Sequence, residues 1–158
     1  MLNKSISWRS KNPQSGAVLM EALVSILIFS IGIIALMALQ AVSIKNSIDA
    51  KYRSDASYFA NQIIAQMWVD RANIDSYANY TSTVTSACTP GGTASSLANV
   101  TTWATQLAAA LPGAVATKQS IVVSTPITGI REVTVMVCWK TPQSTVTNNF
   151  VTTTQINI

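Results

Sequence analysis

The residues that could carry chemistry are few, and the missing types exclude the commonest enzymes. The 158-residue chain contains no histidine, which removes Ser-His-Asp and Cys-His nucleophile systems and histidine-ligated zinc. Its two cysteines, Cys88 and Cys138, are too few for a four-thiolate metal site. Its two glutamates are Glu21 and Glu132. We therefore expect a protein that is not an enzyme and that needs no metal and no cofactor.

Glu21 is the acidic residue whose position needs an explanation. It is the only charged residue among the 28 residues from Ala17 to Ile44, and Ala22–Ile44 is an uncharged run of 23. As a helix, this run would span about 35 Å at ~1.5 Å per residue, enough to cross a ~30 Å hydrocarbon layer. A carboxylate in such a segment is costly unless it lies at the interface, is protonated or has a partner.

The positive charge of the chain is concentrated before the apolar run. Residues 1–16 hold Lys4, Arg9 and Lys11 and no acid, which leaves seven basic residues against six acidic ones in residues 17–158. Basic residues flank the cytoplasmic side of membrane segments more often than the opposite side. The asymmetry predicts a single-pass orientation with the N-terminus in the cytoplasm.

Three interpretations of the apolar run compete. A cleaved secretory signal has an apolar core of about 7–15 residues and an Ala-x-Ala-like site, whereas this core is longer and has no such alanine pair. A plain membrane anchor fits the length but leaves Glu21 without a role. The third interpretation depends on the junction Gln14-Ser15-Gly16-Ala17-Val18-Leu19-Met20-Glu21. There, a basic leader ends in glycine and the fifth residue of the apolar run is a glutamate.

This junction resembles the class III signal of type IV prepilins and related pseudopilins. The resemblance implies that a prepilin peptidase cleaves between Gly16 and Ala17 and that the new amine of Ala17 is N-methylated. It also implies that Glu21 contacts the terminal amine of a neighbouring subunit in a filament, which would cancel most of the buried charge. The alternative for Glu21 is an interfacial acid without a special function. Ala17 departs from the family, which usually has phenylalanine there.

The apolar run is predicted to continue as a long helix. Residues 17–89 contain no proline, and Gly32 is the only glycine between residues 17 and 90. Beyond the run, apolar residues recur at helical spacing and mark one face: Ile44, Ile48, Tyr52, Phe59, Ile63 and Met67. This pattern predicts one helix from about Ala17 to about Ala72, with a globular domain on its striped face. Two helices broken near Gln40–Ser47 are the alternative.

Two stretches of this helix sharpen the resemblance. Ile31–Gln40 reads Ile-Gly-Ile-Ile-Ala-Leu-Met-Ala-Leu-Gln, and Tyr52-Arg53-Ser54 is followed by Met67 and Arg71-Ala72-Asn73. They resemble the long N-terminal helix of PilV-type minor pilins over about residues 14–75. The resemblance implies a prepilin peptidase, other minor and major pilins and the inner-membrane pilus assembly machinery as partners.

The rest of the chain predicts a small domain of one helix and a sheet. Residues 76–96 are rich in Tyr, Thr, Ser, Asn and Gly and indicate an irregular loop. A short amphipathic helix is predicted by Leu97, Val100, Ala104, Leu107 and Leu111, with Trp103 beside the stripe and Pro112-Gly113 at its end. Strands are predicted at Ser120–Ser124, at Arg131–Lys140 with Val133, Val135, Val137 and Trp139 on one face, and at Phe150–Ile158.

Together these elements predict an α+β, type IV pilin-like fold. A long N-terminal helix, apolar and membrane-spanning in its first half, would pack its amphipathic second half on the valine face of a small antiparallel sheet. Cys88 falls in the predicted loop and Cys138 in the central strand. If this domain faces the periplasm, a disulfide between them is permitted and would contribute roughly 4 kcal/mol in the chain-entropy model. The alternative is two free thiols, with Cys138 buried as a small apolar residue.

The expected organisation has four parts. They are a cleaved leader (1–16), a transmembrane or filament-core half-helix (17–44), an amphipathic half-helix (45–75) and a periplasmic domain of loop, short helix and sheet (76–158). The resemblance implies a minor pilin that is stored in the inner membrane and then incorporated into an extracellular type IV pilus. There it would help to initiate assembly and would support twitching motility and adhesion.

Two other functions remain as alternatives. One is a minor pseudopilin of a type II secretion system, which shares the leader and the helix. The other is a pilus-associated adhesin or DNA-uptake pilin. Nucleic-acid binding needs clustered positive charge, and the basic residues after Arg71 are scattered: Lys118, Arg131 and Lys140. We therefore do not expect nucleic acid as a partner.

Overall fold

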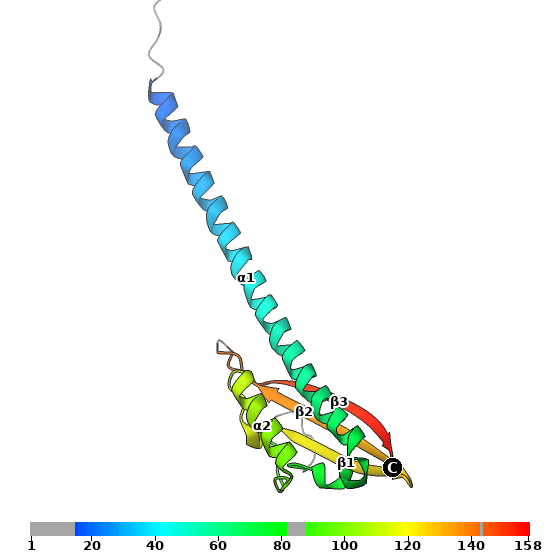
Figure 1. Ribbon diagram of the computed structural model, residues 1–158. Coiled ribbons are helices and arrows are strands. Elements are labelled where there is room, and N and C mark those ends of the chain that lie inside the picture. Colours follow the sequence, from blue (N-terminus) through cyan, green and yellow to red (C-terminus); the bar gives the residue numbers. More distant parts are fainter. Residues whose placement is uncertain (1–14, 82–87, 143) are drawn as a thin grey trace, which may run out of the picture. The chain divides into compact units, whose positions relative to one another are not determined.

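The architecture is α+β, with a long N-terminal helix packed on a small antiparallel sheet (Figure 1). The computed structural model describes residues 15–81, 88–142 and 144–158, so most of the predicted leader lies outside the described residues. The elements are α1 (Ser15–Val69), η1 (Arg71–Tyr77), α2 (Ala98–Ala110), η2 (Ala116–Lys118), β1 (Ser120–Ile127), β2 (Ile130–Trp139) and β3 (Asn148–Asn157). The predicted fold class is confirmed.

The helix α1 is a single element that contributes to two compact units, which divide between Lys45 and Asn46. We call residues 16–45 of α1 the stem and Asn46–Ile158 the head unit. Neither a break near Gln40–Ser47 nor a proline interrupts α1. The two units are described separately below.

The sheet of the head unit has the strand order β1-β2-β3, with both pairs antiparallel. The pairing of β2 with β3 is unbroken from Ile130↔Asn157 to Trp139↔Asn148. The register of β1 against β2 shifts between Ser124 and Ile127, where Pro126 has no N–H group to donate. Gly129 has φ +84° in the turn between these strands, a conformation that side chains with a Cβ rarely adopt.

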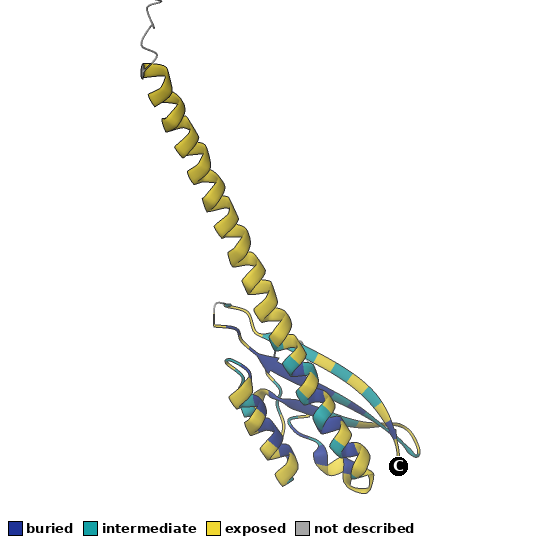
Figure 2. Cartoon of the chain, turned by 45° about the horizontal axis from the view of Figure 1, so that its top comes forward, coloured by how far each residue is buried: buried dark blue, intermediate teal, exposed yellow. Residues whose placement is uncertain are grey.

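One face of the sheet forms the core together with α1 and α2. Alternate residues of β2, namely Val133, Val135 and Val137, are fully buried, as strand periodicity predicts. In the same core cluster, α1 contributes four residues that are also 0 % exposed: Ala56, Ala60, Ile63 and Met67. Figure 2 shows the buried residues of α1 on the side that faces the strands. The small side chains of the two alanines allow a close approach between helix and sheet.

The end of α1 differs from the sequence-based expectation. The helix ends at Val69 rather than near Ala72, and the chain continues as the 3₁₀ helix η1. Side chains three residues apart share one side of a 3₁₀ helix, so this tighter winding buries both Ile74 and Tyr77.

Two further expectations are corrected, one on α1 and one in the segment that follows η1. The apolar stripe is not buried along its whole length, because Ile44 and Ile48 are 61 % and 43 % exposed. The predicted loop over 76–96 is not wholly irregular either. Asn79 pairs with Ile121 of β1 through two backbone hydrogen bonds of 2.9 Å, while residues 82–87 of that loop lie outside the described part of the chain.

Candidate functional site

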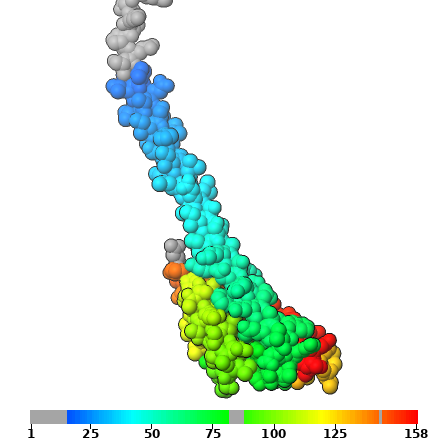
Figure 3. Space-filling model, in the orientation of Figure 1, coloured from blue at the N-terminus to red at the C-terminus, as the bar shows by residue number. Residues whose placement is uncertain are grey.

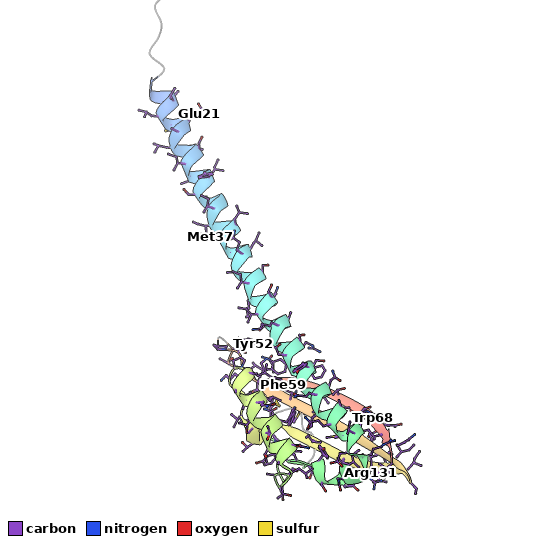
Figure 4. All side chains as sticks on the ribbon, in the orientation of Figure 1. Glu21, Met37, Tyr52, Phe59, Trp68 and Arg131 are labelled. Atoms are coloured by element: carbon purple, nitrogen blue, oxygen red, sulfur yellow. A yellow bond between two sulfur atoms is a disulfide. The ribbon has the colours of Figure 1, made fainter. Side chains whose placement is uncertain are left out.

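The stem carries apolar side chains on every side. Each of its residues is exposed, and Leu19, Phe29 and Leu39 are 67–69 % exposed. Figure 4 shows side chains, with Glu21 and Met37 among those labelled, projecting in all directions around this part of the helix. The most apolar window of α1 has a mean hydropathy of 2.8 and no buried residue, and the helix is long enough to cross a membrane. Such a surface needs lipid or other apolar helices around it.

Two serines of the stem form hydrogen bonds within the helix itself. The hydroxyl of Ser25 donates to the carbonyl of Glu21, and the hydroxyl of Ser30 donates to the carbonyl of Ile26, both at 2.7 Å. These bonds run back four residues within the same helix. They leave no donor on these two serines that must find water, which suits a segment surrounded by hydrocarbon.

Glu21 is the one acidic residue of the stem. It lies one helical turn after Ala17 and is exposed on the surface of the stem. Its carboxylate forms no ion pair or hydrogen bond with the described residues. Any partner for this charge would come from outside residues 15–81, 88–142 and 144–158, and the expected contact with a neighbouring subunit stays a prediction.

Gly16 and Ala17 lie in the first turn of α1. A Cβ added at Gly16 would meet nothing within 4 Å, so the fold does not require glycine there. A requirement for glycine at this position would arise from recognition by another molecule. Cleavage between Gly16 and Ala17, and methylation of Ala17, remain predictions.

Cys88 and Cys138 form a disulfide, so the predicted pairing is confirmed and the alternative of two free thiols is wrong. Their Cα atoms are 5.9 Å apart, both residues are 1 % exposed, and they pack with Met136 on the face of the sheet opposite α1. The bond joins the segment beginning at Cys88 to the central strand across 50 residues of chain. It is a structural cross-link of the head unit.

Gln119 reinforces this cross-link, a role that no sequence pattern predicted. Its side chain is fully buried, where its Oε1 accepts from the backbone N–H of Cys138 at 2.8 Å. Its Nε2 donates to the carbonyls of Cys138 and Val115, each at 3.0 Å. Asn79 extends the network by donating to the carbonyl of Gln119 at 2.9 Å. A signal could have come only from tertiary contacts, because an isolated glutamine before a strand is normally exposed.

A hydrogen bond connects α1 to α2, and an ion pair connects the segment after α1 to β2. The indole Nε1–H of Trp103 in α2 donates to the carbonyl of Phe59 at 2.9 Å. At the other end of the sheet, Arg131 of β2 donates to both oxygens of the Asp75 carboxylate at 2.8 and 3.1 Å. The hydrogen bonds from Arg131 hold the pKa of Asp75 below its usual value; burial opposes this shift to a smaller extent, and the positive charge of Arg131 adds a still smaller lowering. Asp75 raises the pKa of Arg131 by the same hydrogen bonds.

Within the described part of the chain, no group of three or more histidine, cysteine, aspartate or glutamate residues could hold a metal ion. No protein-family model, no curated protein and no solved structure matches this chain. A functional proposal therefore depends on the stem, its single carboxylate and the disulfide-bonded head unit.

Proposed function

We propose that the chain is a minor pilin of a type IV pilus, a non-catalytic filament subunit that helps to initiate assembly and supports twitching motility and adhesion. One observation carries this proposal. A half-helix that is apolar on every side and holds a single carboxylate continues, as one helix, into the core of a disulfide-bonded α+β domain. A membrane-stored subunit that later packs into a helical bundle needs such a surface twice, first against lipid and then against neighbouring stems.

The charge distribution and the disulfide support one orientation. The basic residues before the stem favour a cytoplasmic N-terminus, and structural disulfides persist in oxidising compartments such as the periplasm. The stem would thus be a single-pass anchor in the inner membrane, with the head unit in the periplasm. Prepilin peptidase would remove residues 1–16 at the cytoplasmic face before extraction into the filament.

Glu21 would set the register between subunits. A carboxylate in an apolar bundle is unfavourable alone, but pairing with an amine offsets much of its desolvation cost. The described residues offer Glu21 no such partner, so the amine of Ala17 on an adjacent subunit is the proposed one. The pair forms only when two stems are correctly offset, which makes Glu21 a selector of the stacking arrangement.

Processing is the first test of this proposal. Because a Cβ at position 16 meets no other atom, Gly16→Val should leave the fold unchanged and block only recognition by the peptidase. We expect a full-length precursor on immunoblots of cells that express a prepilin peptidase. Gly32→Val is the matched control, since Gly32 also has open space around it and should allow normal processing. A mature-sized band from Gly16→Val would refute the proposed cleavage.

Assembly is the second test, with Glu21→Ala as the variant and Glu132→Ala as its control at the other glutamate. We expect Glu21→Ala to be processed and to fold normally but to disappear from sheared pili, because an unpaired amine then remains in the bundle. Unchanged incorporation of Glu21→Ala would contradict the role of this residue.

A deletion strain that retains pili and twitching but loses exoprotein secretion would instead identify a type II secretion pseudopilin.

A further inference from the structure

The strand β3 forms one edge of the sheet and pairs with a neighbouring strand on one side only. In the order β1-β2-β3, it pairs with β2 without a bulge along its ten residues. In Figures 1 and 2, β3 lies at the margin of the sheet, and α2 lies on the other side of α1. The outer edge of β3 therefore carries the backbone groups that β2 does not use.

Two observations show which backbone groups of β3 bond to β2. The N–H of Ile158 donates to the carbonyl of Gly129 at 3.0 Å and continues the register of the pair, so even-numbered residues of β3 belong to the hydrogen-bonded class. Cys138 agrees with this assignment, because its N–H and C=O both bond to Gln119 on the side of β1. Even-numbered residues of β2 thus point toward β1, and odd-numbered ones point toward β3, where their partners are even-numbered.

The odd-numbered residues of β3 therefore direct their backbone groups outward. Among these are the N–H and C=O groups of Val151, Thr153 and Gln155, and all three residues are exposed. No residue that the structure describes forms a hydrogen bond with any of these six groups. In Figure 3, the C-terminal end of the chain, coloured red, lies at the surface of the head unit. These donors and acceptors are accessible to another molecule.

The two edges of the sheet differ in how they are protected. Edge strands are usually protected by charges, by proline, by a bulge or by a covering segment. In β1, Pro126 and the register shift interrupt the strand, and Asn79 bonds to the outer side of Ile121. In β3 there is no proline and no register shift, and residues 141–158 contain no charged residue. An unprotected edge of this kind is suited to accept a further strand.

The side chains beside this edge indicate what a further strand must carry. Val151 pairs with Met136, so the odd-numbered side chains of β3 lie on the face opposite α1, where they are small or polar and uncharged. Trp68 of α1 is 43 % exposed and lies about two and a half turns after Phe59, whose carbonyl accepts from α2. Figure 4 shows Phe59 and Trp68 on opposite sides of α1, with Trp68 on the side of β3. Apolar side chains are therefore favoured on the face of the further strand toward α1.

We propose that the outer edge of β3 binds an extended, uncharged segment of another protein, which joins the sheet as a fourth strand antiparallel to β3. The backbone groups of Val151, Thr153 and Gln155 bond to it over a span of about 17 Å. The partner residues that make these bonds carry polar side chains, and the alternate residues carry apolar side chains toward Trp68. The antiparallel direction matches the rest of the sheet and is slightly more stable than the parallel one.

A second copy of this chain is a poorer occupant. Two β3 strands can pair antiparallel only around a two-fold axis perpendicular to the sheet, which makes the two α1 helices run in opposite directions. Two subunits anchored in one membrane need α1 to run in the same direction. This choice of partner rests on the proposed function, whereas the strand-binding edge does not. The experiments below test the edge on the full chain in zwitterionic micelles, without pili.

Hydrogen exchange tests whether the edge is free. The amides of Val151, Thr153 and Gln155 should exchange at least about tenfold faster than those of Thr152 and Thr154, whose N–H groups bond to β2. The two threonines are an internal control, because they lie in the same strand. Equal protection of the two sets would show that the edge is already covered and would overturn the proposal.

The binding test uses the acetylated and amidated peptide Thr-Val-Thr-Val-Thr-Val-Thr with N-methyl groups on its valine amides. Its threonine N–H groups can still bond to β3, while its other edge is blocked. The matched probe carries the methyl groups on the threonine amides instead. We expect the valine-methylated peptide to bind at least about tenfold more tightly and to protect the amides of Val151, Thr153 and Gln155. Equal binding of the two peptides, or binding without this protection, would overturn the proposal.

Two substitutions at Thr153 separate the backbone from the side chain. Both Thr153→Pro and Thr153→Val lose the hydroxyl contact with Thr134 at 3.0 Å, but only Thr153→Pro removes the outward N–H, a loss that edge strands tolerate. We expect Thr153→Pro to weaken binding of the valine-methylated peptide by about tenfold and Thr153→Val to retain it. Unchanged binding by Thr153→Pro would contradict the proposal. If this variant fails to fold, the two methylated peptides decide the question alone.

Trp68→Ala tests the apolar face of the added strand, with Tyr58→Ala as its control. Tyr58 is also on α1 and is 64 % exposed. We expect Trp68→Ala to weaken peptide binding by about tenfold and Tyr58→Ala to leave it unchanged. Equal effects of the two variants would contradict the proposed position of the strand. A dimer of the full chain that disappears in Thr153→Pro, detected by light scattering, would assign the edge to a second copy and refute the proposed partner.

Discussion

The two halves of α1 share a secondary structure and differ in everything that surrounds it. Ile34 in the stem is 67 % exposed, whereas Ile63 in the head unit is 0 % exposed in the same helix. In the head unit, the apolar face of the helix is buried against β2 and α2. In the stem, the apolar surface has no partner among the described residues. A continuous helix can therefore form without burying its apolar side chains, and those of the stem can be buried only by other molecules or by parts of the chain outside the described residues.

Polar groups show the same contrast. In the head unit, Gln119 and Trp103 satisfy backbone groups that are distant in sequence. In the stem, Ser25 and Ser30 bond only to carbonyls four residues back. Long-range bonds fix a unique tertiary structure, while local ones allow a helix to change its surroundings from lipid to protein without losing a bond.

The largest stability effect should come from the disulfide. We expect Cys88→Ser/Cys138→Ser to lower the free energy of unfolding of the head unit by about 4 kcal/mol, because the cross-link closes a long loop in the unfolded chain. Urea unfolding followed by tryptophan fluorescence measures the change. Reduction of the wild-type protein is the control and should give the same loss. Equal stability of the oxidised and reduced forms would show that the disulfide does not stabilise the head unit.

Paired isoleucine substitutions test the comparison within α1. We expect Ile63→Ala to cost about 2–5 kcal/mol, because it opens a cavity in the core. The same substitution at Ile34 should change the stability of the head unit by less than about 0.5 kcal/mol, because no described residue packs on it. Thermal unfolding in micelles compares the two variants. A large loss from Ile34→Ala would show that the stem supports the fold of the head unit.

The smallest effect should come from Asp75 and Arg131. The pKa of Asp75 is lowered in the folded state, so the pair stabilises the protein above the ordinary pKa of 3.8 and loses this contribution as pH falls through the lowered value. The side chain of Asp75 is 67 % exposed, and solvent screening keeps the gain small. Asp75→Asn should therefore lower the melting temperature slightly at pH 7 and not at all at pH 2.

Asp55→Asn is the control for this pH dependence, since Asp55 forms no ion pair with the described residues. High salt should reduce the difference between wild type and Asp75→Asn at pH 7. A difference that persisted at pH 2 would assign the effect to something other than the charge on Asp75.

The features that sequence predicted best are those with a regular local signal. Alternating valines predicted the buried face of β2, and the spacing of apolar residues predicted α2. The features it missed depend on long-range contacts. Ile48 continues the helical stripe but is exposed, and Gln119 looks like a surface residue but is buried beside Cys138.

The stem, the helix-and-sheet composition and the residue types available for chemistry are all evident from the amino-acid sequence. Hydrophobic run length and periodicity are local properties, so they can be read without knowing what the chain packs against. The tertiary structure was needed to show which residues of α1 are buried, that Cys88 and Cys138 bond, and that Gln119 is buried beside Cys138. These outcomes depend on which residues meet across the fold, and burial and hydrogen bonding there follow from packing rather than from residue type.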